Sequence, residues 1–181
     1  EIVRRMLQSD LLENLRGTLM VVPIVNAFGF HNRSRYLPDH RDLNRSFPGS
    51  SEGSLASRLA GIFLGKVVKR CDLGIDLHSA AIHRTNLPQM RISTDNPRTL
   101  ELAEAFGAPV ILASPLREGS LRATAKEVGV DVLLYEAGEG LRFDEMAARA
   151  GVAGILRVLR SLNMLPAKGI AKARAKPLYC E

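Results

Sequence analysis

The sequence predicts an α/β fold in three layers, with helices on both faces of a mostly parallel mixed sheet. Two observations support this. From residue 54 to residue 162, segments with the apolar period of a helix alternate with short apolar runs of strand length. Such alternation is typical of right-handed crossovers in a sheet covered on both faces. The chain has 181 residues, 46% of them hydrophobic, which is enough to bury one substantial core.

The first part of the chain is less regular. Apolar residues recur at helical spacing over residues 1–16 and Gly17 follows as a stop, so we expect an amphipathic helix there. Residues 18–25 form a near-continuous apolar run, which predicts a buried strand with Pro23 at its distal end or on an edge. Residues 26–53 lose this periodicity and fill with polar residues, which predicts a long irregular loop that is either functional or disordered.

The rest of the chain alternates regularly. We expect helices at residues 54–70, 97–106, 120–128 and 143–162, and strands at residues 72–77, 89–93, 109–113 and 130–135. One domain of residues 1–165 would hold all these elements. Residues 166–181 are rich in Ala and Lys without a core-forming pattern, which indicates a linker toward a further domain.

Composition narrows the classes of function. The formal charge of +6 is spread over nearly every segment. The densest basic group lies in the tail and consists of Lys168, Lys172, Arg174 and Lys176. No aromatic platform accompanies it, so we expect no nucleic-acid partner. No apolar run reaches the roughly 18 residues of a membrane-spanning helix, so we expect no membrane partner. Cys71 and Cys180 fit neither a disulfide framework nor a metal-binding cysteine cluster, and a cytoplasmic location is the simplest expectation.

Two polar residues stand at the ends of predicted strands, where sites gather in open α/β sheets. His78 follows residues 74–77. It could be a Zn²⁺ ligand whose tautomer is fixed by a neighbouring acceptor such as Asp76, or a histidine bonded to backbone. Glu136 follows residues 132–135. It could be the general base of a metal site, or a salt-bridging or helix N-terminal carboxylate. A single histidine does not make a catalytic zinc site.

The predicted long loop carries several guanidinium groups. Arg33, Arg35 and Arg45 lie close to Asp42 and Asn44 in the sequence. Arginine offers a planar fork that matches a carboxylate, so this grouping favours recognition of a carboxylate, with Asp42 able to orient its neighbours. The alternative is a solvated basic loop.

Three motifs follow one another in the chain. They are Asp-Leu-Asn-Arg-Ser-Phe-Pro-Gly at residues 42–49, Asp-Leu-His-Ser at residues 76–79 and Glu-Ala-Gly at residues 136–138. Their ordered combination resembles the succinylglutamate desuccinylase/aspartoacylase family, a branch of the zinc carboxypeptidase-like fold, and the likeness extends through residues 84–88 and 138–143. The resemblance implies a zinc-dependent hydrolase that cleaves the amide bond of a small-molecule N-acyl amino acid or related carboxylate.

The resemblance also implies a metal centre. His78 would be the last of three zinc ligands, and Glu136 would be the base that handles the metal-bound water. In this family the other two ligands lie in a His-Gly-Asp/Asn-Glu motif before the first helix. That motif does not occur in the sequence, so both ligands are expected a few residues upstream of Glu1. A smaller β-rich domain is expected beyond residue 181.

The same resemblance assigns roles in the loop. Asn44 and Arg45 would hold the substrate carboxylate, and Arg35 would polarise the scissile carbonyl. The acyl group of the substrate stays open, as does the oligomeric state, with a homo-oligomer as one alternative.

Two other functions are weighed against the zinc hydrolase. One is a catalytically incomplete carboxylate-binding or interaction module of the same fold. The other is a serine hydrolase, because Gly49, Ser51 and Gly53 fit the GxSxG pattern. The serine hydrolase is disfavoured, since its nucleophile requires a buried strand leading into the serine, and here a polar loop containing Pro48 precedes it.

Overall fold

The computed structural model describes residues 1–173 and 175–180; Arg174 of the predicted basic tail and Glu181 lie outside the described residues. The chain divides into two compact units. Unit 1 consists of Glu1–Val21, Ile75–Pro115 and Leu133–Glu181, and unit 2 of Val22–Gly74 and Leu116–Val132.

A mixed sheet has the strand order β1-β4-β2-β3-β5. β2 is parallel to β3 and antiparallel to β4, and β3 is parallel to β5. The predicted α/β fold with a mixed sheet is therefore confirmed. The strands are β1 (Leu73–His78), β2 (Asn86–Ile92), β3 (Val110–Ala113), β4 (Asp131–Gly138) and β5 (Leu178–Cys180).

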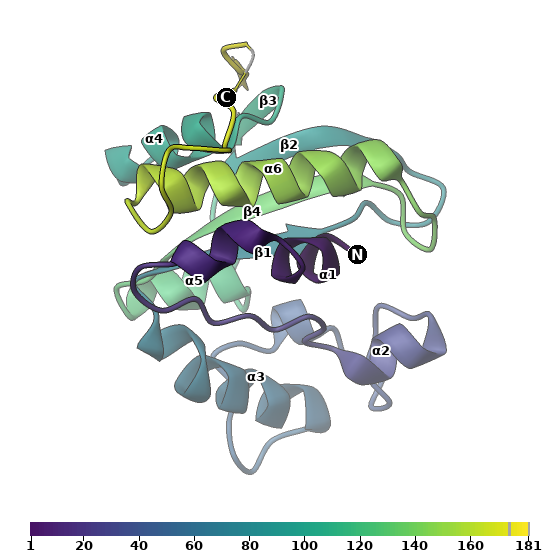
Figure 1. The fold of residues 1–181 in the computed structure, drawn as a ribbon. Helices are drawn as coiled ribbons and strands as arrows, with labels where there is room; N and C mark the ends of the chain where they lie inside the picture. The colour runs from purple at the N-terminus through teal and green to yellow at the C-terminus, as the bar shows by residue number, and fades with distance from the viewer. Residues whose placement is uncertain (174, 181) are drawn as a thin grey trace. The chain divides into compact units, whose positions relative to one another are not determined.

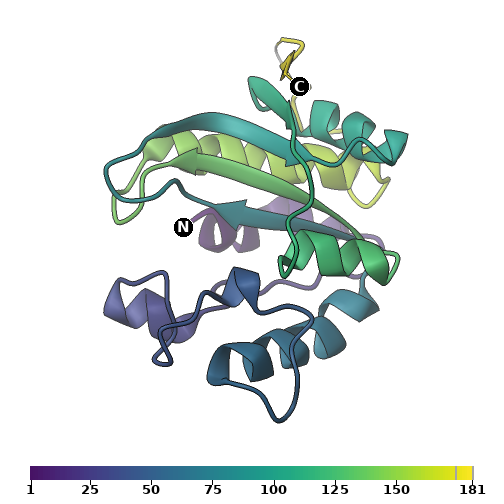
Figure 2. The same cartoon turned by 180° about the vertical axis from the view of Figure 1, so that it is seen from behind.

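The helices of unit 1 begin at clear sequence signals. The Asn96 side chain accepts the backbone N–H of Arg98 at the start of α4, and the Asp144 side chain caps α6 in the same way. α6 runs along one face of the sheet (Figure 1), and from behind, β2 and β4 lie in front of it (Figure 2). These helices are α1 (Ile2–Leu7), the short 3₁₀ helix η1 (Asp10–Asn14), α4 (Pro97–Phe106) and α6 (Glu145–Ser161).

The core of unit 1 lies between β4 and these helices. Tyr135 of β4 is fully buried, its ring lies 4.9 Å from that of Phe106, and its hydroxyl donates to the carbonyl of Ala147 at 2.8 Å. Burial raises the pKa of the Tyr135 hydroxyl, and the charge of Asp144 adds to the effect. Gly154 of α6 has no side chain where the Phe106 ring packs. β4 is thus held rigidly from the α6 side.

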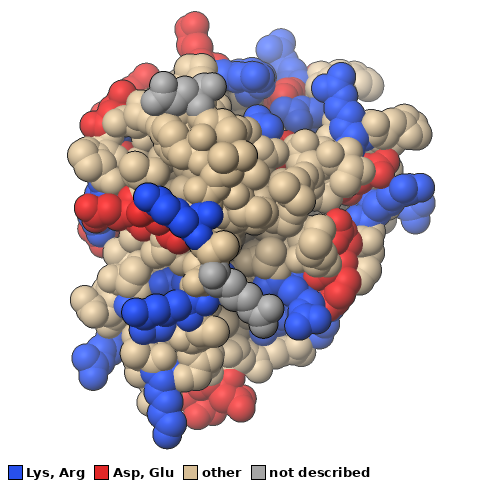
Figure 3. Space-filling view, turned by 90° about the horizontal axis from the view of Figure 1, so that it is seen from above, with Lys and Arg blue, Asp and Glu red and all other residues tan. Residues whose placement is uncertain are grey.

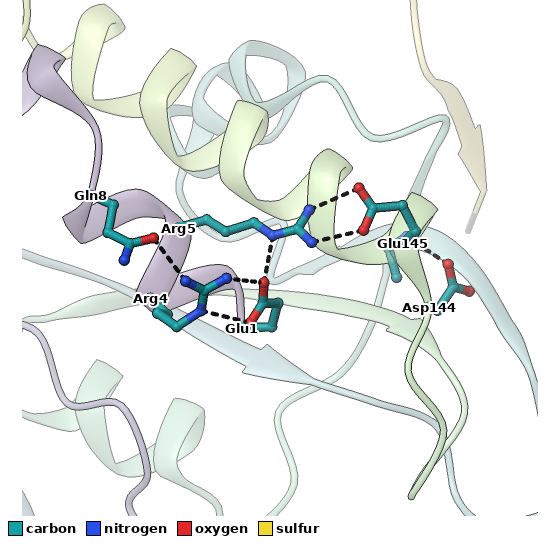
Figure 4. Close-up of polar contacts among 7 residues, drawn as sticks. Glu1, Arg4, Arg5, Gln8, Asp144 and Glu145 are labelled. Carbon is teal, nitrogen blue, oxygen red and sulfur yellow. Dashed lines mark hydrogen bonds and ion pairs between the residues drawn. The ribbon is translucent and has the colours of Figure 1, made fainter.

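Helix α1 is joined to the start of α6 by charged groups (Figure 4). Arg5 donates both terminal nitrogens to the two oxygens of Glu145, each at 2.8 Å, and its Nε donates to Glu1 at 2.6 Å. Arg4 also binds Glu1. The guanidinium of Arg5 lies 5.9 Å from the ring centroid of Phe143. Apolar packing adds to this charged network, because the side chain of Met6 on α1 is buried.

The pairing of β2 with β4 contains a bulge. Asn86 pairs with Gly138 and Gln89 with Glu136, so three steps along β2 match two steps along β4. One extra residue therefore lies in β2 between these pairs. Pro88, which has no N–H for the ladder, falls in this stretch. The bulge decides which β2 side chains share a face with Glu136.

Unit 2 has its own core. The buried side chains of Leu43, Phe47, Ala60 and Leu64 belong to one apolar cluster, in which the Phe47 and Phe63 rings meet edge to face at 6.4 Å. The helices of unit 2 are α2 (Ala27–Asn32), η2 (Leu43–Arg45), α3 (Leu55–Lys66), η3 (Val68–Arg70) and α5 (Leu121–Glu127).

Three predicted segments differ in the structure. The helix expected over residues 1–16 is broken between α1 and η1. The strand expected over residues 18–25 is wrong: the segment pairs with none of the described strands, because apolar character alone supplies no ladder partner and Pro23 cannot donate. The predicted loop of residues 26–53 contains the short helices α2 and η2.

Two strand predictions also change. β4 continues to Gly138, so Glu136 lies within the strand instead of after it. Within the predicted linker of residues 166–181, β5 pairs with β3, because backbone pairing does not require an apolar pattern. The assignment of residues 1–165 to one domain stays a prediction.

Charge on the molecular surface is mixed. On the face shown in Figure 3, basic and acidic side chains are interspersed. Within the described residues, no helix combines the length and apolarity needed to cross a bilayer.

Candidate active site

His78 is the last residue of β1, one residue beyond the end of the predicted strand of residues 72–77. Asp76 lies two residues earlier on the strand, so both side chains project from the same face. The Oδ2 atom of Asp76 lies 2.8 Å from Nε2 of His78, and both side chains are partly buried. This contact restrains the imidazole ring, and the role of Asp76 in orienting a metal ligand stays a prediction.

A three-ligand zinc site does not fit the described residues alone. Among residues 1–173 and 175–180, no group of three or more His, Cys, Asp or Glu side chains could hold a metal ion. A catalytic zinc requires about three protein ligands and an open position. His78 would therefore need ligands from outside these residues.

Glu136 lies on β4, the strand next to β1 in the sheet. Its side chain is 15% exposed, and its Oε2 atom lies 2.8 Å from Nε of Arg91 on β2. The N–H of Arg91 is not aimed well enough to count as a hydrogen bond, so the contact is an ion pair. The carboxylate is thus held close to a permanent positive charge.

The segments that follow His78 and Glu136 are bound to each other. The carboxylate of Glu139 accepts the backbone N–H of His83 at 2.9 Å and pairs with Arg142 at 3.3 Å. The backbone N–H of Ala80 donates to the carbonyl of Gly138. These bonds hold the two segments together directly after the candidate site residues.

The loop residues of unit 2 form a separate group. Arg35 pairs with Oδ2 of Asp42 at 2.8 Å, and Oδ1 of Asp42 accepts the backbone N–H of Asn44 at 2.9 Å. Asp42 therefore binds the guanidinium of Arg35 and the backbone of Asn44, and its role in orienting substrate-binding side chains stays a prediction. Asp39 anchors the same loop to the start of α3, because its carboxylate accepts the N–H of Ala56, and this bond holds the pKa of Asp39 below its usual range.

Asn44 and Arg45 are fixed from the opposite side of this loop. Oδ1 of Asn44 accepts the backbone N–H of Leu121 at 2.8 Å, at the first residue of α5. Gly119 adopts φ +72°, and a Cβ there would lie 2.9 Å from the carbonyl oxygen of Arg45. Arg45 lines an open depression of about 440 Å³ together with Phe47, Pro48, Glu118, Gly119, Thr124 and Glu127.

The structure thus brings the predicted residues together in two groups. Asp76, His78 and Glu136 lie on adjacent strands β1 and β4, whereas the Arg35 to Arg45 group lies in unit 2. Sequence reasoning missed Arg91 and Glu139. Arg91 is a charged residue inside the predicted strand of residues 89–93, and this was a signal that could have drawn attention to it. Its pairing with Glu136 could not be predicted, because that pairing depends on the bulge in β2.

The family is decided by comparison with known sequences. A sequence profile described as the succinylglutamate desuccinylase/aspartoacylase catalytic domain matches residues 1–162. The chain belongs to this family. N-alpha-acetyl-L-2,4-diaminobutyric acid deacetylase from Halomonas elongata is 34% identical over 103 residues, which are 54% of this chain and 30% of the relative.

Solved structures of the family share the fold. The succinylglutamate desuccinylase/aspartoacylase from Rhodobacter sphaeroides superposes with a TM-score of 0.86 at 25% identity, over 99% of this chain and 55% of that one. The product-bound ectoine utilization protein EutE (DoeB) from Ruegeria pomeroyi gives a TM-score of 0.88 at 23% identity, over 99% and 57%. The chain spans just over half the length of these solved relatives. The predicted family and α/β fold are confirmed.

The disfavoured serine hydrolase gains no support. Residues 51–53 form a turn and a bend in the loop that leads into α3, and the described residues immediately before them belong to no strand. The strand, sharp turn and helix that expose a nucleophilic serine are therefore not formed around Ser51.

Proposed function

We propose that the complete protein hydrolyses the amide bond of an N-acyl amino acid, with Glu136 as the base that activates water. Support comes from the family match over residues 1–162 and from the placement of Glu136 beside the strand that ends at His78. A carboxylate fixed on a rigid strand suits general base catalysis, because proton transfer requires a set distance and direction.

We also propose that the complete protein uses zinc, with His78 as one ligand and the other ligands supplied from outside the described residues. When bound, zinc would polarise a carbonyl and acidify water. Asn44 and Arg45 are assigned to the substrate carboxylate and Arg35 to the scissile carbonyl. Arginine binds a carboxylate through its planar fork, and the amide of Asn44 keeps its N–H₂ group for a ligand, since its oxygen is bonded to Leu121.

Glu136→Gln in the complete protein tests this function. The substitution preserves the size of the side chain but removes the base, so kcat should fall by about 10²- to 10⁴-fold. The assay follows amine release from a panel of N-acetyl and N-succinyl amino acids that includes N-α-acetyl-2,4-diaminobutyrate, the compound named for the Halomonas relative. Zinc content, measured by elemental analysis, should stay the same.

Glu139→Gln is the matched control. Its carboxylate lies three residues further along, its side chain is 12% exposed against 15% for Glu136, and Gln keeps an oxygen for the N–H of His83. This variant should retain most of its turnover. Wild-type turnover in Glu136→Gln would reject Glu136 as the base.

A further inference from the structure

Arg91 is a charged residue between two buried apolar residues of the sheet. On β2 its neighbours Met90 and Ile92 are fully buried. The side chain of Arg91 is 31% exposed, and its guanidinium contacts Glu136. A charged pair in this setting loses part of its hydration, and exposed or partly exposed ion pairs add little to stability. The position of Arg91 therefore calls for a reason other than folding.

Strand register explains why Arg91 reaches Glu136. Gln89 lies directly opposite Glu136, and Arg91 is two residues further along β2, so it is a diagonal neighbour on the same face. Met90 lies opposite Tyr135 and faces the side on which Tyr135 bonds to α6. Gln89, Glu136 and Arg91 thus form a polar group on the face opposite α6.

We infer that Arg91 is a positioning residue for Glu136, an inference that rests on the proposed function. A glutamate side chain has three rotatable torsions, and the terminal one is broad. The ion pair with Nε of Arg91 holds Oε2 on one side, and Oε1 is the oxygen assigned to receive the proton of the attacking water. Arginine suits this task because it stays charged throughout a proton transfer.

The inference makes a specific kinetic prediction. Arg91→Met in the complete protein removes the charge but keeps an apolar stem, so Glu136 loses its orientation. We expect kcat to fall by about 10- to 100-fold with little change in KM, since misplacing a reacting group by about 1 Å has that order of effect. Arg91→Lys keeps a charge without the planar fork and should recover part of the lost kcat.

Arg98→Met is the control. Arg98 is exposed on α4 in the same unit, and the bond it makes to the Asn96 cap uses its backbone N–H, which the substitution retains. This variant removes the same formal charge from the same unit and should keep wild-type kcat and KM. A fall equal to that of Arg91→Met would attribute the effect to net charge and overturn the inference.

A double-variant cycle separates this inference from the proposed function. If Arg91 acts through Glu136, adding Arg91→Met to Glu136→Gln should lower kcat no further. Equal losses in both backgrounds would overturn the positioning role, as would a loss confined to KM, which would mean contact with substrate. If the Arg91→Met single variant kept wild-type kcat while the Glu136→Gln single variant was inactive, the positioning role would be rejected and the proposed function would stand. Wild-type kcat in Glu136→Gln would reject the proposed function itself.

Folding is checked for every variant by thermal melting. If Arg91→Met does not fold, Arg91→Lys decides the question. It should show a several-fold lower kcat, an unchanged KM and no further loss in the Glu136→Gln background. Wild-type kcat in Arg91→Lys would then overturn the inference.

Discussion

Replacing Gly154 by Ala should destabilise the core that supports β4. A Cβ at residue 154 would lie 2.2 Å from Cε1 of Phe106 and 2.4 Å from Cδ1 and Cζ. Carbon atoms normally pack about 3.5–4.0 Å apart, so the ring would have to move by more than about 1 Å. Phe106 is fully buried and packs 4.9 Å from Tyr135, so the ring has no space to move into.

The size of the effect follows from two opposing contributions. Overpacking of a core costs about 1–3 kcal/mol, and Ala in place of Gly within a helix contributes about 1 kcal/mol in the other direction. We therefore expect Gly154→Ala to lower the free energy of unfolding by up to about 2 kcal/mol, and the 2.2 Å approach to Phe106 favours the upper end of this range. Gly65→Ala on α3 is the matched substitution, because no atom lies within 4 Å of the added Cβ. It should stabilise the protein by about 0.5–1 kcal/mol.

Thermal melting of the complete protein compares the two variants. The melting temperature of Gly154→Ala should lie a few degrees below wild type, on the scale of about 2–4 °C per kcal/mol for a domain of this size. That of Gly65→Ala should equal or exceed wild type. A Gly154→Ala protein that melts at or above Gly65→Ala would refute the packing argument.

Two further predictions concern charge and the loop. The hydrogen bonds from Arg4 and Arg5 lower the pKa of Glu1 from 4.5 to about 2, and the bond from Arg5 also lowers that of Glu145. A carboxylate with a depressed pKa stabilises the fold above its ordinary pKa and loses this effect as the pH falls. Hydrogen exchange of the α1 amides should therefore show the helix loosening between about pH 4.5 and pH 2. Replacing both Arg4 and Arg5 by Met should remove most of this dependence, because both side chains bond Glu1. A pH response that the double variant leaves intact would contradict the assignment. Asn44→Ala loses the acceptor for the backbone N–H that begins α5, so the free energy of unfolding should fall by about 1 kcal/mol. Asn44→Asp keeps the acceptor but removes the amide donor. KM should rise in both variants and the melting temperature should fall mainly in Asn44→Ala; an unchanged KM in Asn44→Asp would exclude Asn44 from substrate binding.

Local signals explain which elements the sequence predicts well. Helix α4 spans residues 97–106 in both prediction and structure, because Asn96 caps its start, Pro97 suits the first turn, and Gly107 ends it at φ +75°. These signals act within a few residues and need no tertiary partner.

Elements that depend on a distant partner are harder to predict. The apolar run of residues 18–25 has strand composition but pairs with no described strand, whereas residues 178–180 have no strand pattern and pair with β3. Contacts in the candidate active site also divide into those set by nearby residues and those set by a distant strand. The contact of Asp76 with His78 follows from their spacing on one strand, but that of Arg91 with Glu136 requires the register of two strands 45 positions apart.

The bulge in β2 has a consequence for how relatives are aligned. If the same residues paired without a bulge in the register set by Asn86 and Gly138, Pro88 would stand opposite Glu136, and the diagonal position on that face would fall to Met90 instead of Arg91. In a family member with the same number of residues in β2 but no bulge, a cation with the same task would therefore occupy the alignment column before Arg91. Such a member would look as if it lacked the residue when columns are compared, and only superposition of the strands would reveal the equivalence.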